Sequence, residues 1–237
     1  MAFPLTHLLV ADAILTSHPR HETEEALFML GSIAPDAIHH RKEFTGAEMK
    51  NIGAAKKVTH LCPISDERWG MTTDNIGWAK CVKRFLHGNT GPFAEGYAIH
   101  VLTDIYTNMT IWERVRTQYP EETAKGYESG YYRDLKDIDV RLYHSLVKGS
   151  RIERLLAQAK ACDMPGLVSE EEVCAIRDNI LYVHCKDRLP IPGYKYTYVS
   201  YGETLDFIRE AAGFTVGVLI DVYGEIRRCR TYRRRKE

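Results

Sequence analysis

Apolar residues recur at helical rather than strand spacing along most of the chain, and this pattern predicts an all-α protein. Near the start, for example, Leu5, Leu8 and Leu9 would share one face of a helix. The expected helices cover about residues 5–14, 24–33, 93–116, 136–147, 151–161, 169–183 and 203–228.

Local signals mark the ends of several of these helices. Gly91-Pro92 precedes the long central helix and predicts its start. Ser169 followed by Glu172 is the sequence of a capping box, in which each side chain binds the backbone N–H of the other residue. Residues 189–201 are rich in proline and tyrosine and predict an irregular or extended connection.

These patterns predict one domain over residues 1–229, a single-domain helical bundle with long connecting loops. Residues 230–237 would form a basic C-terminal tail, since seven of the ten residues 227–236 are Lys or Arg. We expect this tail to be solvated and dispensable for chemistry elsewhere in the chain. The connection from about His39 to Lys57 is a candidate site-lining loop, because loops carry much binding chemistry.

Composition narrows the class of protein. Hydrophobic residues make up 44% of the 237 residues and the formal net charge is zero, so no global field favours nucleic acid or a membrane surface. No apolar run approaches the roughly 20 residues that span a bilayer. The six cysteines include no Cys-x-x-Cys pair, which argues against a zinc ribbon or a thioredoxin motif. The N-terminal residues lack a basic start and a clear cleavage site, so we expect a cytoplasmic protein with reduced thiols.

The candidate chemistry lies in the predicted central helix, where His100 and Asp104 are four residues apart in an apolar stretch. Residues at this spacing share a helix face and can bind one metal ion. Three other apolar segments carry a potential ligand each: His7, Asp36 and His60. We therefore predict that His7, Asp36, His60, His100 and Asp104 form one metal-binding constellation.

Each residue alone also has an ordinary structural interpretation. A His-x-x-x-Asp pair is more often a surface pair or a hydrogen bond in the core, and His7 could be a satisfied core histidine. Asp36 after a proline could end a turn or cap a helix, and His60 could end a helix. Their shared feature is an apolar or small neighbourhood. Burial of a polar group without a partner is unfavourable, and a metal ion would supply the partner.

The ligand types favour zinc, in one or two ions, although another divalent metal would also fit. Zinc binds imidazole nitrogen and carboxylate oxygen, and a catalytic site keeps one position open for water. A metal-activated water would then attack an ester or phosphoester of a small molecule or lipid. Asp36 is the candidate catalytic residue, as a general base close to the metal.

The same residues resemble the zinc-dependent phospholipase C family, part of a helical superfamily that also contains single-strand-specific nucleases. The resemblance covers roughly the first half of the chain, and both the order and the approximate spacing of the landmarks match. These landmarks are Thr6-His7, Gly31-Ser-Ile-Ala-Pro-Asp36, Thr59-His60 and Gly96-Tyr97-x-x-His100-x-x-x-Asp104.

The resemblance implies that Asp36, His60, His100 and Asp104 surround one zinc. His7 and Asp104 would hold a second zinc, so that Asp104 bridges the two ions. In the secreted phospholipases the processed N-terminal residue is also a ligand, whereas this chain starts Met1-Ala2-Phe3.

Those enzymes hold a third zinc through a further histidine and a His-x-x-x-Glu pair. No such pair follows Asp104 here, and His144 and His184 look isolated. This departure keeps two rival functions open. One is a non-catalytic protein with a structural metal. The other is a nuclease-like protein whose basic tail binds nucleic acid, although the zero net charge argues against a nucleic-acid partner.

Two further segments could bind or merely pack. The run from His39 to Lys42 could bind a substrate phosphate or could be a solvated loop. The tyrosines at 194, 196, 198 and 201 could form a cleft wall or could pack on the domain surface.

Overall fold

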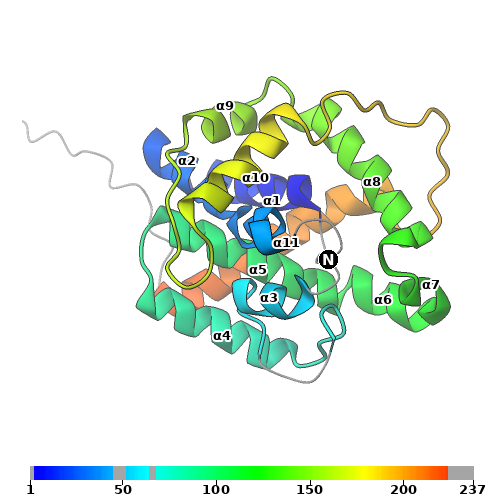
Figure 1. Ribbon diagram of the computed structural model, residues 1–237, viewed down its shortest axis with the longest axis horizontal. Coiled ribbons are helices and arrows are strands. Elements are labelled where there is room, and N and C mark those ends of the chain that lie inside the picture. Colours follow the sequence, from blue (N-terminus) through cyan, green and yellow to red (C-terminus); the bar gives the residue numbers. More distant parts are fainter. Residues whose placement is uncertain (1–2, 45–51, 64–67, 224–237) are drawn as a thin grey trace, which may run out of the picture.

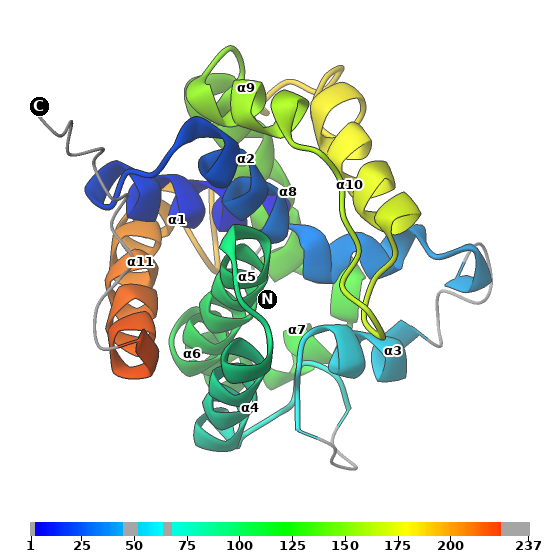
Figure 2. The same ribbon diagram turned by 90° about the vertical axis from the view of Figure 1, so that its left-hand side faces the viewer.

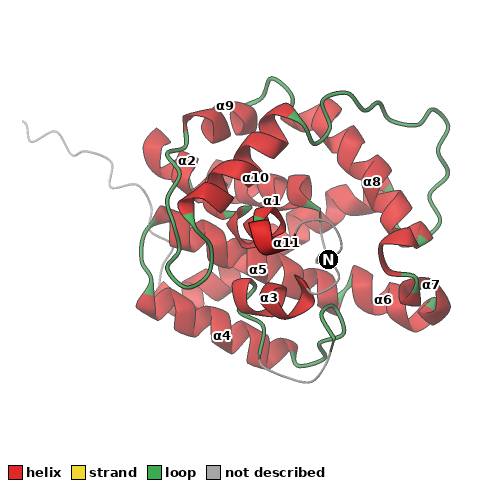
Figure 3. Ribbon diagram, in the orientation of Figure 1, coloured by secondary structure: helices red, strands yellow, loops and turns green. Residues whose placement is uncertain are grey.

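The computed structural model describes residues 3–44, 52–63 and 68–223 (Figure 1). Within these ranges the regular structure is helical, apart from an isolated bridge between Met164 and Val168 (Figure 3). The predicted all-α single-domain fold is confirmed. The predicted basic tail, residues 230–237, lies outside the described residues.

The helices follow one another through connections that include long irregular segments. In chain order they are α1 (Pro4–Ser17), α2 (Glu22–Gly31), η1 (Ala34–His40), η2 (Lys42–Phe44), α3 (Ile52–Thr59), α4 (Asn75–Gly88), α5 (Pro92–Met109), α6 (Ile111–Gln118), α7 (Pro120–Ala124), η4 (Gly126–Glu128), α8 (Gly130–Leu142), η5 (Tyr143–Val147), α9 (Arg151–Gln158), α10 (Glu170–Tyr182) and α11 (Tyr201–Tyr223).

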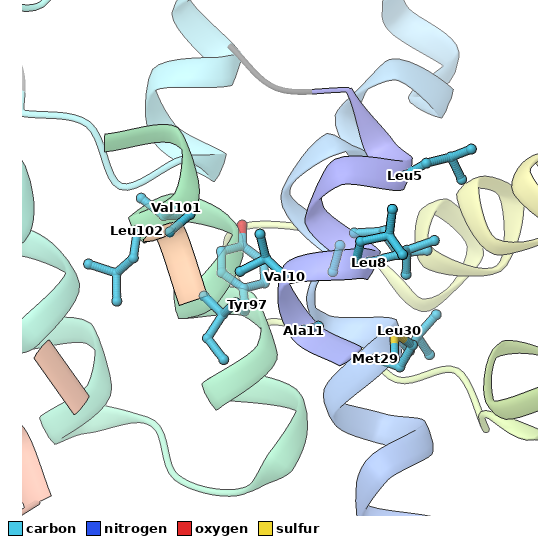
Figure 4. Close-up of a cluster of buried hydrophobic side chains, with 14 of the residues drawn as sticks. Leu5, Leu8, Val10, Ala11, Met29, Leu30, Tyr97, Val101 and Leu102 are labelled. Atoms are coloured by element: carbon cyan, nitrogen blue, oxygen red, sulfur yellow. The ribbon is translucent and has the colours of Figure 1, made fainter. Parts of the chain in front are cut away.

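Helix α5 is the centre of the bundle, with 15 of its 18 residues buried. Helices α1, α2, α4 and α11 pack around it, and α10 packs against η1 (Figures 1 and 2). The core beside α5 includes Leu8, Leu30, Tyr97 and Val101, none of which has accessible surface (Figure 4). Full burial of a large apolar side chain stabilises a fold by about 1.5–3 kcal/mol. This packing holds the helices that carry the predicted metal ligands.

Two glycines let α2 and α5 touch through their backbones. A Cβ atom on Gly31 would lie 2.2 Å from the Phe93 carbonyl oxygen, and one on Gly96 would lie 2.0 Å from the Phe28 carbonyl oxygen. Real side chains cannot occupy those positions, so alanine at either residue would push the helices apart. This close approach brings the C-terminal end of α2 beside His100.

The predicted helix over 93–116 is wrong in its continuity. The chain forms α5 and α6, and the break falls at Thr110, whose φ and ψ are −121° and −95°. The hydroxyls of Thr103, Thr107 and Thr110 each bond to the carbonyl oxygen four residues earlier, at 2.6–2.9 Å. Such bonds compete with the helical ladder and bend a helix, and here they precede its end.

Other predicted boundaries hold to different degrees. The capping box of α10 is confirmed: Ser169 Oγ accepts from the Glu172 N–H at 3.2 Å, and the Glu172 carboxylate accepts from the Ser169 N–H at 3.0 Å. The irregular connection before α11 is also confirmed. The predicted 136–147 helix starts earlier, at Gly130, and its last turn is π-helical.

The expected loop from His39 to Lys57 is wrong where the structure describes it. His39 belongs to η1, and Lys56 and Lys57 belong to α3. Helices α3 and α4 were not expected from the sequence. No helix in the described ranges has both the length and the apolar character needed to span a membrane.

Candidate metal centre

The structure brings the five predicted ligands to one place in the core. His7 comes from α1, Asp36 from η1, and His100 and Asp104 from α5, while His60 directly follows α3. The three histidines have no accessible surface, and the side chain of Asp36 is 13% exposed. Their role as metal ligands stays a prediction, but their convergence is a property of the fold.

Side chains from α4 and α5 hold the C-terminal end of α3 in place, and with it the backbone of His60. The Trp78 indole N–H on α4 donates to the His60 carbonyl oxygen at 2.7 Å. The Tyr97 hydroxyl on α5 donates to the Thr59 carbonyl oxygen at 2.5 Å. The tyrosine in the Gly96-Tyr97 landmark therefore positions a neighbouring ligand.

Backbone carbonyls determine which ring nitrogens of the two central histidines carry hydrogen. His100 Nδ1 lies 2.8 Å from the Ser32 carbonyl oxygen, and His60 Nδ1 lies 3.0 Å from the Lys56 carbonyl oxygen. A carbonyl only accepts, so each Nδ1 is assigned the hydrogen, and each Nε2 of a neutral ring keeps a lone pair. The two Nε2 atoms face each other at 3.2 Å. Two lone pairs at this distance require a cation or a shared proton between them.

The carboxylates of Asp36 and Asp104 face the same point. Asp36 Oδ1 lies 3.4 Å from His60 Nε2, and Asp104 Oδ2 lies 3.7 Å from His60 Nε2 and 3.8 Å from His100 Nε2. The centre therefore combines two nitrogen lone pairs with two acceptor-only groups, which is the donor set of a divalent cation.

His7 adds an imidazole without a hydrogen-bond partner. Its ring stacks on that of His100 with centroids 3.7 Å apart, and its Nε2 lies 3.6 Å from Asp104 Oδ1. Neither ring nitrogen of His7 has a hydrogen-bond partner among the residues that the structure describes. Burial and the nearby His100 lower the pKa of His7 well below its usual range. The ring is therefore neutral, the form that binds metal.

The spacing of these atoms is compatible with binding of a metal ion. A tetrahedral ion with bonds of about 2.0–2.1 Å separates its ligand atoms by roughly 3.3 Å. Two groups have ligand atoms that all lie within 4.8 Å of one another: His7, Asp36 and His100, and His60, His100 and Asp104. The residues present therefore fit one ion, or two ions that share ligands.

Lys56 is a member of this centre that the sequence did not reveal. Its Nζ lies 3.2 Å from Asp36 Oδ1 and 2.9 Å from His39 Nε2, and the residue is 6% exposed. Burial alone would lower the pKa of Lys56, but Asp36 outweighs it and keeps the ammonium charged. In turn, burial would raise the pKa of Asp36, but Lys56 holds it well below its usual range. A carboxylate with a low pKa is a weak base, so its surroundings suit ligation better than proton abstraction.

The centre opens into a cavity of about 750 Å³. Asp36, Lys56 and Asp104 line its polar end together with His39 and His40. Most of the remaining wall is apolar or aromatic: Phe3, Pro4, Ile52, Trp69, Tyr127, Tyr132, Ile176 and Ile180.

The segment from His39 to Lys42 is divided between this cavity and the fold. The two histidines line the cavity, and burial together with Lys56 lowers the pKa of His39 to about 4. Arg41 points elsewhere: its guanidinium donates to the Glu172 carboxylate at 2.6 Å and to the Leu167 carbonyl at 2.9 Å. Arg41 thus connects η1's end to α10, and its role is structural.

The expectation that His184 is isolated is wrong. Its Nε2 pairs with the carboxylate of Asp139 on α8, and its ring also lines the cavity. Burial opposes protonation, but bonds to Asp139 and Cys185 raise the pKa of His184 to about 10. His144 instead lies 2.7 Å from the Arg188 carbonyl oxygen, away from the centre.

Comparison of the chain with protein-family models, with curated proteins and with solved structures gave no match. The resemblance to the zinc-dependent phospholipase C family therefore remains a prediction from the residues themselves.

Proposed function

We propose that this protein is a metal-dependent hydrolase that acts on a phosphoester at the centre formed by His7, Asp36, His60, His100 and Asp104. The observation that carries the proposal is the pair of facing lone-pair nitrogens, His60 Nε2 and His100 Nε2, 3.2 Å apart. They lie beside the carboxylates of Asp36 and Asp104, which line the cavity. A purely structural cluster would be expected to bury such nitrogens against donors rather than against each other and against carboxylates.

Zinc is the favoured ion, because the donor set is imidazole nitrogen and carboxylate oxygen. A bound divalent ion would supply a nucleophilic water near neutral pH and would offset the charge that develops on the phosphoryl oxygens. The carbonyls of Ser32 and Lys56 hold the His100 and His60 rings in the tautomer that presents Nε2 to that ion.

The chain's own residues would also hold the substrate. The Lys56 ammonium lines the cavity beside Asp36, where it can donate a charge-assisted hydrogen bond to a phosphoryl oxygen. The largely apolar wall suits the carbon portion of a small-molecule or lipid phosphoester and would exclude water from it.

The test is turnover of bis(para-nitrophenyl) phosphate and para-nitrophenyl phosphate by the purified chain. We expect hydrolysis that is lost with a chelator and restored by Zn²⁺. His100→Ala should abolish turnover, whereas Asp134→Asn, a change of a buried carboxylate outside the cavity, should not. Metal-loaded wild-type protein that turns over neither these compounds nor a lipid phosphodiester would refute the proposal.

A non-catalytic metal-binding protein is the second candidate, and one observation favours it. Lys56 Nζ already lies 3.2 Å from Asp36 Oδ1, so an ammonium partly neutralises a carboxylate that a catalytic metal would use. Stoichiometric metal without turnover, and stability that depends on the metal, would support this alternative.

A further inference from the structure

A second group of potential ligands lies outside the five-residue centre. Asp139 comes from α8, and His184 and Cys185 follow the C-terminal end of α10. One carboxylate oxygen, one imidazole nitrogen and the thiol sulfur of these residues lie within 4.8 Å of one another. The three residues meet although Asp139 is 45 positions from His184 in the chain.

The Asp139 carboxylate is buried and only half satisfied. The residue is 3% exposed, and its Oδ2 pairs with His184 Nε2. Its Oδ1 is also buried and has no hydrogen-bond partner among the described residues. A buried carboxylate oxygen without a partner is unfavourable, and a cation or donor from outside the surrounding fold would satisfy it.

Cys185 supplies a ligand of a different chemical class. The residue is 1% exposed, and its thiol forms no disulfide within the described ranges. Neighbouring His184 lines the cavity, so the group can be reached from solvent along that side. Thiolate, imidazole and carboxylate together favour Zn²⁺ over hard cations such as Mg²⁺ or Ca²⁺.

We propose that Asp139, His184 and Cys185 form a second metal site that takes a thiophilic divalent ion such as Zn²⁺. Binding displaces the protons of the thiol and the imidazole, which go to solvent, and gives Asp139 Oδ1 or Oδ2 a cationic partner. Three protein ligands leave a fourth position for water or for a ligand that enters from the cavity. The rival interpretation is a plain His184–Asp139 ion pair with an unligated thiol.

The two metal sites differ in their ligand atoms, and this difference makes the proposal testable. The five-residue centre offers only nitrogen and oxygen, whereas the second site offers sulfur. Bound Co²⁺ gives an intense near-ultraviolet charge-transfer band only when a thiolate is a ligand. We therefore propose to titrate the metal-free, full-length protein with Co²⁺ and to record absorption and stoichiometry.

We expect wild-type protein to develop the thiolate band and His100→Ala to keep it. Cys185→Ser should lose the band, and Asp139→Asn should weaken the associated Co²⁺ binding by roughly tenfold or more. Cys62→Ser is the matched control and should keep the band, since Cys62 is also buried and lies two residues from His60.

Wild-type protein that binds Co²⁺ without the band, or Cys185→Ser that keeps it, would overturn the proposal. The wild-type spectrum alone can contradict the proposal, so the test does not depend on whether every variant folds. The result is also independent of phosphoester turnover, so it stands or falls separately from the proposed function.

Discussion

Asp134 and Asp137 on α8 are buried, as is Asp104 at the candidate metal centre, yet the groups around them differ. Asp134 Oδ2 accepts the backbone N–H groups of Thr197, Tyr198 and Val199 at 2.7–3.3 Å. Its Oδ1 accepts the Tyr194 hydroxyl at 2.9 Å. Both oxygens of this carboxylate therefore accept hydrogen bonds from the irregular connection before α11.

Asp137 holds the same connection one turn further along α8. It accepts the Ile191 N–H at 2.8 Å, the Tyr196 hydroxyl at 2.7 Å and the Arg141 guanidinium at 2.6 Å. Two tyrosines of the 194–201 cluster thus pack on the domain through α8, and they do not line the cavity at the metal centre.

At the candidate metal centre the carboxylates instead lie beside imidazoles, and Asp36 also pairs with the Lys56 ammonium at 3.2 Å. Asp36 and Asp104 lie 3.4–4.0 Å from imidazole nitrogens whose hydrogens point the other way, towards backbone carbonyls. Carboxylates are thus largely buried in both regions, but their neighbours differ: backbone N–H groups, tyrosine hydroxyls and an arginine on α8, and imidazoles with one lysine at the candidate centre. A buried acid that accepts several hydrogen bonds secures a loop, whereas buried acids beside imidazole lone pairs form a donor set that a cation fits.

The largest difference that we expect between the two regions is in metal content. His100→Ala should remove at least one ion per chain, because His100 belongs to both groups of potential ligands. Metal analysis of the purified variant measures this, with circular dichroism to confirm that it is folded. Asp134→Asn is the control and should keep the wild-type metal stoichiometry. Equal metal content in the two variants would show that His100 is not a metal ligand.

Asp134→Ala should show the reverse pattern. It leaves three backbone N–H groups and one tyrosine hydroxyl without their acceptor, and each bond to a charged group contributes about 1.5–3 kcal/mol. Allowing for water that reaches the connection, we expect the free energy of unfolding to fall by about 3 kcal/mol with metal content unchanged. Urea denaturation measures the loss. A loss below about 1 kcal/mol would mean that this carboxylate does not hold the connection.

Chelation should lower the melting temperature by several degrees. A ligand present at 100 times its Kd adds about 2.7 kcal/mol to the stability of the folded state. In a domain of this size 1 kcal/mol corresponds to about 2–4 °C, so we expect a fall of about 5–10 °C. Asp134→Ala should show a chelator-dependent fall of the same size, since distant sites act additively. A wild-type melting curve that ignores the chelator, after metal release is verified, would show that the metal does not cross-link the helices.

The sequence predicted much of the fold where apolar periodicity and caps act locally. Helices α1, α2, α9, α10 and α11 follow from these signals. The break at Thr110 was missed because apolar residues continue into α6, at Ile111, Trp112 and Val115, whereas the break is a backbone event. Helix α4 had a usable signal in Trp78, Val82 and Leu86, which are buried at four-residue spacing behind the Asp74 N-cap.

The five candidate ligands were predictable because each is a ligand-type side chain within an apolar segment. Lys56 was not, since lysine is nearly always exposed and its burial depends on how α3 packs against η1. The pairing of Asp139 with His184 also leaves no local pattern, because the two residues lie 45 positions apart and meet only in the tertiary structure. Candidate ligands can therefore be predicted from local sequence, whereas charge partners such as Lys56 and His184 are set by tertiary packing.

The smallest expected effect concerns Lys56, whose ammonium competes with a metal ion for the Asp36 carboxylate. Lys56→Met should raise the affinity of the centre for Zn²⁺ by about tenfold, because a charge about 4 Å from a metal ligand is worth up to about 4 kcal/mol in a partly screened interior. The metal-free variant should at the same time be less stable than wild type, since Asp36 loses its buried partner. Calorimetric titration and chelator-treated melting curves measure the two changes. Lys57→Met on the same helix carries the same change in charge and is the matched control. If Lys56→Met binds zinc no more tightly than Lys57→Met does, the ammonium does not compete with the metal. The Lys56–Asp36 pair then only stabilises the fold, as the hydrogen bonds of Asp134 and Asp137 do.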